Sequence, residues 1–348
     1  KGCMAEVDTQ QTAAVPPLAQ LADMIFGKAQ THLLFVAAKL GIADLLQDGP
    51  KPVADLAKAT NAHVPSLYRA LRALAGMGVF AETEPGYFTL TSLADLLRTD
   101  APSSLKGLAL MAGSDWHNRA WAHLFESVQT GKSYFATTYG MHMYEYLRQH
   151  PADQDNLAEA MASMSQQDAV AVCTGYDFSA FHTLVDVGGG TGYFLAALLK
   201  TYPTLKGILL DQPGVADQAR ARIKAEGLDD RCEVIGGDFF HSVPRGGDGY
   251  TIKGVIENWD DERAGTILTN CREAMNPEGR VLVIGMVIPP GNTPSLNKVL
   301  DMEMLAFLDG GVVRTEAEFQ ALFSRAGLKI SRVLSIPSPY SIIEGVPV

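Results

Sequence analysis

Residues 184–192 read Leu-Val-Asp-Val-Gly-Gly-Gly-Thr-Gly, and this stretch decides the fold. Its first four residues predict a short buried strand, and the apolar residues at 193–201 predict a helix that follows. The glycines between them allow a tight turn and a close approach of the backbone to a ligand. Tyr193 stands where a nicotinamide-binding G-x-G-x-x-G loop needs its third glycine. The pattern therefore fits the ammonium group of an amino acid better than a pyrophosphate.

The alternation of strands and helices continues to the end of the chain. Further strands are expected at 207–211, 232–238, 249–257 and 280–288, helices at 215–227, 260–275 and 315–326, and a closing hairpin at 329–336 and 340–345. This order predicts an α/β fold: a doubly wound, Rossmann-like sheet over residues 181–348, with ligand crevices at the carboxyl ends of its strands.

Acidic residues end three successive strands of this expected sheet. Asp186 precedes the glycines, Asp211 ends the second strand, and Asp238 ends the third and is followed by Phe239. A carboxylate on the second strand can accept hydrogen bonds from both hydroxyls of a ribose. An Asp beside an aromatic ring suits the amino group and the face of adenine. An amino-acid tail, a ribose and an adenine together describe S-adenosylmethionine, which we expect as the cofactor.

The first hundred residues have a different pattern. Residues 1–17 are expected to be a flexible N-terminus; helical spacing from Leu18 onward is followed by helices at 52–59 and 65–77 and a hairpin at 79–90. This order outlines a winged helix over residues 18–100. Residues 52–98 carry four basic and four acidic side chains, whereas a DNA-reading wing is basic. We therefore expect a mainly helical dimerisation domain, with a regulatory DNA-binding module as the alternative.

Composition narrows the expected partners and compartment. The 348 residues are 47% hydrophobic, and the net charge of −11 argues against nucleic acid and anionic membranes as partners. No uncharged apolar run approaches the ~20 residues of a membrane span. The four cysteines lack metal-ligand spacing and are typical of thiols in a reducing cytosol, so we expect a cytoplasmic protein. Asp260 and Asp261 are expected to cap a helix, and no metal is expected.

Residues 101–180 are expected to be a helical linker that also lines an acceptor pocket. Large aromatic and methionine side chains, among them Trp116, are frequent there and suit a flat apolar ligand. Residues 131–140 have the composition of a surface loop.

Several segments resemble the class I S-adenosylmethionine-dependent small-molecule O-methyltransferases, in particular the plant caffeate type and its bacterial natural-product relatives. They are residues 184–192, Leu210-Asp211-Gln212-Pro213, Gly237-Asp238-Phe239-Phe240, and the stretch from Ile252-Lys253 to Asn258-Trp259-Asp260-Asp261. Residues 67–74 and 86–91 look like the dimerisation domain of the family, so the resemblance extends over nearly the whole chain.

The resemblance implies a homodimer and assigns roles by position. The cofactor would be held at its methionine portion by Asp186, Gly188 and Gly190, at its ribose by Asp211, and at its adenine by Asp238 and Phe239, with Lys253 beside it. The acceptor pocket would be lined by Leu157, Met161, Met164, Met304 and Leu308.

The catalytic positions depart from the family pattern. Glu257 stands where the family has a general-base His, and Gly285 and Val313 stand where it has the two acids that orient that His. Glu257 is therefore the expected catalytic residue, either as a base with a raised pKa or as a carboxylate that stabilises a cationic acceptor. The alternatives are that Glu257 only packs, or pairs with Lys253 or Arg314, and that the base is replaced by His117 or His142.

These observations predict methyl transfer from S-adenosylmethionine to a small, aromatic or heteroaromatic natural-product acceptor. The acceptor atom, O, N or C, is left open. Loss of the His and both acids also suits a second interpretation, in which the enzyme uses the cofactor without methyl transfer, as a pericyclase or a decarboxylating hydroxylase.

Overall fold

The computed structural model describes residues 16–101 and 103–348, without the side chains of residues 162, 166 and 167. The expected flexible N-terminus at 1–17 lies outside the described residues except for its last two, and Pro17 begins the first helix. The chain divides into two compact units, with the boundary between Thr99 and Asp100. No helix in the described part is long and apolar enough to cross a membrane.

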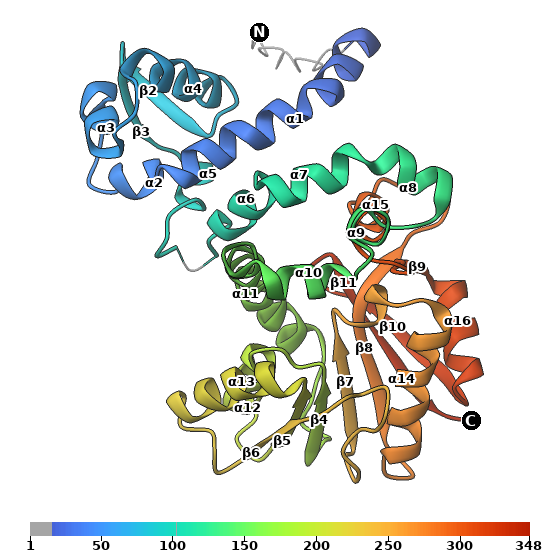
Figure 1. The fold of residues 1–348 in the computed structure, drawn as a ribbon. Coiled ribbons are helices and arrows are strands. Elements are labelled where there is room, and N and C mark those ends of the chain that lie inside the picture. Colours follow the sequence, from blue (N-terminus) through green and yellow to red (C-terminus); the bar gives the residue numbers. More distant parts are fainter. Residues whose placement is uncertain (1–15, 102) are drawn as a thin grey trace, which may run out of the picture. The chain divides into compact units, whose positions relative to one another are not determined.

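The first unit is helical with a small antiparallel sheet (Figure 1). Its helices are α1 (Pro17–Lys39), α2 (Ile42–Leu45), α3 (Val53–Thr60), α4 (Val64–Gly76) and α5 (Ser92–Asp95). The predicted hairpin is β2 (Phe80–Glu84) and β3 (Tyr87–Leu90), and an unpredicted strand, β1 (Lys51–Pro52), pairs with β3. Its core contains Leu67, Leu71 and Leu74 of α4 with Phe80 and Phe88.

The second unit is built on an eight-stranded mixed sheet. Its strands are β4 (Thr183–Val187), β5 (Lys206–Asp211), β6 (Cys232–Gly236), β7 (Gly249–Lys253), β8 (Arg280–Ile288), β9 (Arg314–Thr315), β10 (Leu328–Ser335) and β11 (Tyr340–Pro347). The order is β10-β11-β8-β7-β4-β5-β6, with β9 beside β8. The chain runs from β4 outward to β6 and then returns to β7 on the other side of β4. The boundary of β4 and β7 is therefore the switch point at which open α/β sheets bind ligands.

Helices cover both faces of this sheet (Figure 1). One face packs against α11 (Pro151–Gly175), α12 (Tyr193–Thr201) and α13 (Pro213–Ala225), and the other against α14 (Asp261–Ala274) and α16 (Glu316–Arg325). The predicted doubly wound, Rossmann-like sheet is confirmed. The helix at 193–201 and the strand at 280–288 have the predicted bounds.

The remaining helices of the second unit contribute side chains to one apolar cluster. They are α6 (Lys106–Ala112), α7 (Asp115–Ala122), α8 (Leu124–Thr130), α9 (Tyr134–Tyr139), α10 (Met143–Gln149) and α15 (Asn297–Phe307), of which the sequence pattern did not predict α15. The predicted loop at 131–140 is wrong: Ser133 caps α9 by accepting a hydrogen bond from the Ala136 amide, and the rings of Tyr134 and Phe135 are buried.

The predicted strand at 249–257 is too long. Strand β7 ends at Lys253, because Gly254 takes a φ of +64° and turns the chain. Residues Ile256–Asn258 then form a 3-10 turn, η1. Asp260 caps α14 as predicted, by accepting a hydrogen bond from the Arg263 amide.

Candidate active site

A glycine loop joins β4 to α12 at the switch point. Gly188 and Gly190 take φ values of +71° and +58°, which favour glycine. A Cβ atom on Gly188 would lie 2.8 Å from Cγ2 of Val255 and 3.6 Å from Cε1 of Phe239. The loop therefore lies against Phe239, and a larger residue at 188 would displace Val255.

Asp186 lies under this loop with one carboxyl oxygen unpartnered. Its Oδ1 accepts a hydrogen bond from Thr251 Oγ1 at 2.8 Å, whereas Oδ2 has no partner among the described residues. A Cβ on Gly189 would lie 2.6 Å from that Oδ2. Burial raises the pKa of Asp186 to about 6, although the Thr251 hydrogen bond and the charge of Lys253 oppose the shift. A buried carboxyl oxygen without a partner under a glycine loop suits a cationic ligand group.

The next two strand ends carry other predicted cofactor residues. Asp211 accepts hydrogen bonds from the amides of Gly190 at 2.8 Å and Gln212 at 2.7 Å, which ties it to the glycine loop. Burial raises the pKa of the Asp211 carboxyl. Asp238 follows β6 and accepts a hydrogen bond from the Phe240 amide at 2.9 Å. The structure thus brings together, along the carboxyl edge of β4, β5 and β6, Asp186, Gly188, Gly190, Asp211, Asp238 and Phe239.

Lys253, at the end of β7, is engaged by α11. Its Nζ lies 3.5 Å from Oδ2 of Asp168 and 3.4 Å from Oγ of Ser165. The same Nζ lies 5.3 Å from the ring centroid of Tyr340. Asp168 is 5% exposed and also accepts a hydrogen bond from Ser338 Oγ at 2.7 Å. Sequence reasoning missed Asp168, Ser338 and Tyr340, because no motif or spacing marks them.

Glu257 lies in the η1 turn as a buried, unpaired carboxyl. It is 5% exposed, and its Oε1 has no hydrogen-bond partner among the described residues. Burial raises the pKa of Glu257 to about 7, and the shift is only partly opposed by its own backbone amide and by the charges of Lys253 and Arg314. The described part of the chain shows no ion pair of Glu257 with either cation. Instead, Lys253 pairs with Asp168 and Arg314 with Asp261.

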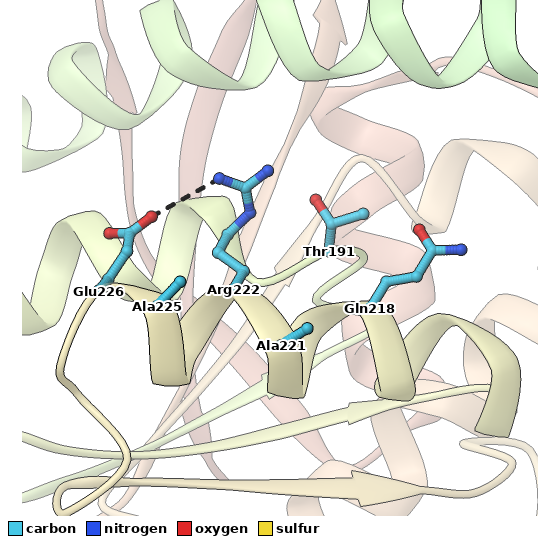
Figure 2. A pocket seen from close by; sticks show the side chains of 6 residues that line it. All are labelled: Thr191, Gln218, Ala221, Arg222, Ala225 and Glu226. Carbon is cyan, nitrogen blue, oxygen red and sulfur yellow. Dashed lines mark ion pairs between the residues drawn. The ribbon is translucent and has the colours of Figure 1, made fainter.

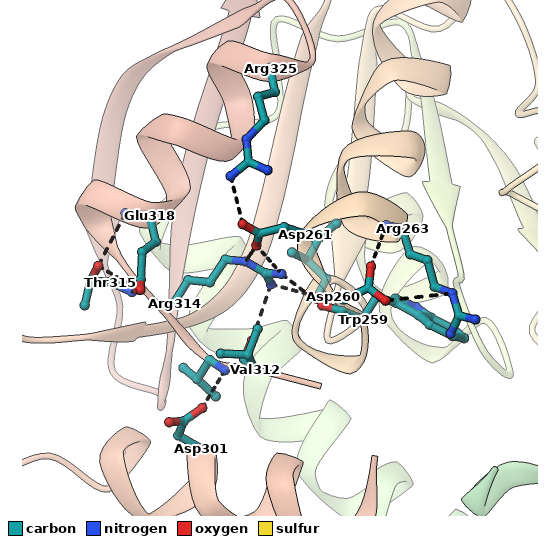
Figure 3. Close-up of polar contacts among 12 residues, drawn as sticks. Trp259, Asp260, Asp261, Arg263, Asp301, Val312, Arg314, Thr315, Glu318 and Arg325 are labelled. Atoms are coloured by element: carbon teal, nitrogen blue, oxygen red, sulfur yellow. Dashed lines mark hydrogen bonds and ion pairs between the residues drawn. The ribbon is translucent and has the colours of Figure 1, made fainter. Parts of the chain in front are cut away.

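Arg314 holds the turn that carries Glu257, and Figure 3 shows its side chain beside Asp261, Trp259 and Val312. Its side chain is 2% exposed and donates hydrogen bonds at 2.9–3.3 Å to three carbonyl oxygens, those of Ile256, Val312 and Trp259. Its charge is paired with Asp261, 2.9 Å away. The Val312 amide in turn donates to the carbonyl oxygen of Glu257 at 2.8 Å. The backbone on both sides of Glu257 is therefore held by the Arg314 side chain and by Val312, which precedes β9.

An aromatic cluster borders the same turn. It contains four predicted acceptor residues, Trp116, Leu157, Met304 and Leu308, together with Phe135 and Phe307. A Cβ added at Gly311 would lie 2.8 Å from Cβ of Leu308 and 3.2 Å from the carbonyl oxygen of Glu257, so the cluster reaches the turn there. The other two predicted acceptor residues, Met161 and Met164, are outside the cluster, and Met161 is 42% exposed.

His117, a candidate replacement base, is bound to an acid within the aromatic cluster. Its Nε2 lies 2.6 Å from Oε1 of Glu303, and Oε2 of Glu303 accepts a hydrogen bond from Trp121 Nε1 at 2.9 Å. The His117 ring lies 4.7 Å from the ring of Phe307. Glu303 comes from α15, the helix that the sequence pattern did not predict.

His142, the other candidate, is part of an aromatic stack. Its ring stacks with those of Trp259 and Tyr144, with centroid distances of 5.8 and 5.6 Å. Burial lowers the pKa of His142, so the stacked ring is neutral near pH 7. Burial and the nearby carboxylates of Glu257 and Asp211 raise the pKa of Tyr144 to about 12. Tyr144, one of the large side chains of the expected pocket segment, is therefore a neutral hydroxyl near both acids.

A separate hollow of about 400 Å³ lies along α13 (Figure 2). Its lining residues are Thr191, Gln218, Ala221, Arg222, Ala225 and Glu226. Arg222 is occupied by Glu226, 3.6 Å away, and by the ring of Tyr193, 5.3 Å away. No predicted cofactor or acceptor residue lines this hollow, so it is not the candidate active site.

Known proteins resemble the chain over nearly its whole length. An O-methyltransferase domain family matches residues 121–329, and an O-methyltransferase dimerisation domain family matches residues 22–100. A phenazine O-methyltransferase of Lysobacter antibioticus is 44% identical over 98% of this chain and 99% of its own length. An aclacinomycin 10-hydroxylase of Streptomyces purpurascens is 35% identical over 89% of this chain and 86% of its own length.

A solved structure adds a ligand-bound comparison. It is an O-methyltransferase from neocarzinostatin biosynthesis in complex with S-adenosylmethionine and 2-hydroxy-5-methyl naphthoic acid. It is 33% identical to this chain, with a TM-score of 0.79 over 97% of this chain and 100% of its own.

Proposed function

This chain belongs to the S-adenosylmethionine-dependent O-methyltransferase family, and from that premise we propose that it methylates a hydroxyl group on a planar aromatic or heteroaromatic natural product, with Glu257 as the base. The chain is a methyltransferase, and its dimerisation domain indicates a homodimer. The acceptor, its reacting atom and the role of Glu257 are the proposal.

The cofactor is S-adenosylmethionine, whose sulfonium supplies an electrophilic methyl group. We propose that it binds along the strand ends, because Gly188 leaves a space that a Cβ would fill and Asp186 has a spare oxygen beneath the loop. In this arrangement the carboxylate of Asp211 accepts hydrogen bonds from the ribose hydroxyls, while the Gly190 amide holds that carboxylate in place. The adenine end is then bound by Asp238 and Phe239.

One observation carries the catalytic part of the proposal: Glu257 is a buried carboxyl with an unpartnered oxygen, next to the aromatic cluster. As a carboxylate it accepts the proton of the acceptor hydroxyl while that oxygen gains the methyl group. The products are the methyl ether, S-adenosylhomocysteine and protonated Glu257, which then releases its proton to water. A pKa of about 7 is near optimal for a general base at neutral pH.

The aromatic cluster supports a planar acceptor. Rings of Trp116, Phe135 and Phe307 lie within 5.6–6.3 Å of one another in edge and tilted arrangements. Such walls suit the faces and edges of a fused-ring ligand. The relatives named for phenazine and crystallised with a naphthoic acid support the same class. A cytoplasmic location is part of the proposal, because Cys173, Cys232 and Cys271 are free thiols.

Glu257→Gln tests the base. It keeps the shape of the side chain but cannot accept the proton, so kcat with a hydroxyphenazine acceptor should fall by roughly 10²-fold or more. The affinity for S-adenosylmethionine, measured by calorimetry, should barely change. Glu262→Gln, on the exposed side of α14, removes a nearby negative charge and serves as the control. Full turnover by Glu257→Gln would reduce Glu257 to a structural role.

The 35% identity to a hydroxylase favours a second candidate, in which the cofactor is used without methyl transfer. The two candidates differ in one product. Methyl transfer releases one S-adenosylhomocysteine for each acceptor consumed, whereas the second candidate consumes acceptor and releases none. Mass spectrometry of both products from the same reaction decides between them.

A further inference from the structure

Two cations approach the turn of Glu257, and each is bound to a different acid. Lys253 lies four residues before Glu257 and is paired with Asp168 of α11 at 3.5 Å. Arg314 holds the turn by its carbonyl oxygens and is paired with Asp261 at 2.9 Å. Glu257 itself has an unpartnered oxygen among the described residues. The cations are thus neutralised by other acids, and the carboxyl between them is left without an ion pair.

We propose that Asp168 is a positioning residue for catalysis: its ion pair with Lys253 keeps that ammonium from pairing with Glu257, so that the carboxyl of Glu257 stays free to exchange a proton with the acceptor. The inference rests on the proposed role of Glu257 as the base. Asp168 suits this task because two further contacts fix the pair. Ser338 donates a hydrogen bond to its Oδ1 at 2.7 Å, and Ser165 lies 3.4 Å from the Lys253 ammonium.

The charged and titratable groups around Glu257 fix the sign of the effect. Lys253 on β7 and Arg314 on β9 favour the carboxylate, and Asp168 on α11 opposes it. Two tyrosines also face Glu257: burial raises the pKa of Tyr144, on α10, to about 12, and burial also raises the pKa of Tyr340, on β11, well above its usual value, so neither adds a charge near neutral pH. Removing the charge of Asp168 should therefore lower the pKa of Glu257, and removing the charge of Lys253 should raise it.

The experiment compares Asp168→Asn with Lys253→Met. The readout is the infrared carbonyl band of a protonated carboxylic acid, followed from pH 5 to 9. The band is assigned to Glu257 by subtracting the spectrum of the same protein with Glu257→Gln added. This subtraction also removes the contribution of Asp186, whose pKa is about 6. The midpoint should move to lower pH in Asp168→Asn and to higher pH in Lys253→Met, each by roughly 0.5–1 pH unit. The double variant should return toward the wild-type midpoint.

Opposite shifts are the decisive result, because loss of packing alone would move both midpoints in the same direction or neither. Asp217→Asn, in the exposed pair with Arg220 on α13, should leave the midpoint unchanged. Thermal unfolding checks that each variant is folded. If Asp168→Asn does not fold, Lys253→Met alone decides: a Glu257 midpoint that moves to lower pH or does not move overturns the inference. The titration needs no acceptor, so it fails independently of the proposed function. The proposed function is tested by the pH dependence of kcat with a hydroxyphenazine. If kcat of Glu257→Gln still falls at low pH as it does in the wild type, Glu257 is not the base and the proposed function fails.

Discussion

A Cβ atom on Gly285 would lie 3.6 Å from Oε2 of Glu257, so the carboxyl of Glu257 faces a position that carries no side chain. The second position at which the family has an orienting acid, Val313, is also apolar and is buried. An imidazole placed at 257 would therefore find no carboxylate at either position to fix its tautomer and orientation.

From this relationship we predict that Glu257→His does not restore efficient methylation of simple phenols. Its kcat should be no higher than that of Glu257→Gln, measured with the same hydroxyphenazine and with guaiacol-type phenols. Adding Gly285→Asp to Glu257→His should recover part of the loss, because it supplies the missing partner. A single Glu257→His variant that matches or exceeds wild-type turnover would contradict this account.

The buried Glu257 should cost stability at neutral and alkaline pH. Its pKa is about 7 in the native state against an ordinary value of 4.5, so the native state holds this proton more tightly than the unfolded state. The contribution of the Glu257 proton to the free energy of unfolding is fully present below about pH 4.5 and is lost as the pH rises to about 7. We therefore compare the free energy of unfolding of Glu257→Gln with that of the wild type. The difference, variant minus wild type, should be roughly 2–3 kcal/mol larger at pH 8 than at pH 4.5. Urea unfolding at both pH values measures this difference, and an equal effect at both would refute it.

The glycine loop offers a contrast between two glycines with similar backbone conformation. Gly188→Ala would place a Cβ 2.8 Å from Val255, whereas Gly190→Ala would meet no atom of the protein within 4 Å. Both substitutions place alanine at positive φ, which costs roughly 1 kcal/mol. Without cofactor, Gly188→Ala should therefore unfold at a clearly lower temperature than Gly190→Ala. Both should weaken S-adenosylmethionine in calorimetry; unchanged affinity in Gly190→Ala would show that the backbone there does not approach the cofactor.

The placement of the proposed cofactor residues at one edge of the sheet was predictable, because the signals for it are local. A strand, a glycine loop and a helix follow one another from Thr183 to Thr201, and the acids at 186, 211 and 238 lie at or within two residues of the end of a strand. Parallel strands bring such ends to one edge of a sheet whatever the details of packing, so sequence order was enough.

The environment of Glu257 was not predictable, because it depends on contacts between distant segments. Asp168 is 85 residues from Lys253 and 170 from Ser338, and a lone Asp in a long helix has no distinguishing pattern. The predicted strand over 249–257 also hid the turn, since an apolar run before Glu257 resembles a strand until Gly254 breaks it. The segment 131–140 was predicted as a loop on composition, but burial of Tyr134 and Phe135 outweighs the intrinsic preference.

Arg314 and Arg325 both bind Asp261 (Figure 3), but of the two only Arg314 also reaches the turn of Glu257. Arg314→Lys keeps the charge but cannot reach three carbonyl oxygens at once, which leaves buried acceptors unpaired. It should destabilise the protein by about 2–5 kcal/mol and lower kcat, with little change in the affinity for the cofactor. Arg325→Lys, on the exposed side, should change stability by less than ~0.5 kcal/mol. Denaturant unfolding of the two variants side by side tests this, and equal losses would show that the carbonyl contacts contribute nothing.

The exposed face of α1 gives the last prediction. Leu18, Met24, Ile25 and Phe26 are 68–84% exposed in the single chain, although each is large and apolar. A homodimer gains stability by burying such side chains, at roughly 25 cal/mol for each Å² removed from water. Replacing Ile25 and Phe26 by Glu would put two charges into that interface, so the variant should be a monomer by light scattering at micromolar concentration. Gln30→Glu, an exposed polar position on the same helix, should remain a dimer. A dimer that survives the double substitution would show that α1 lies outside the interface, because two buried, unpaired carboxylates cost more than the contacts they replace.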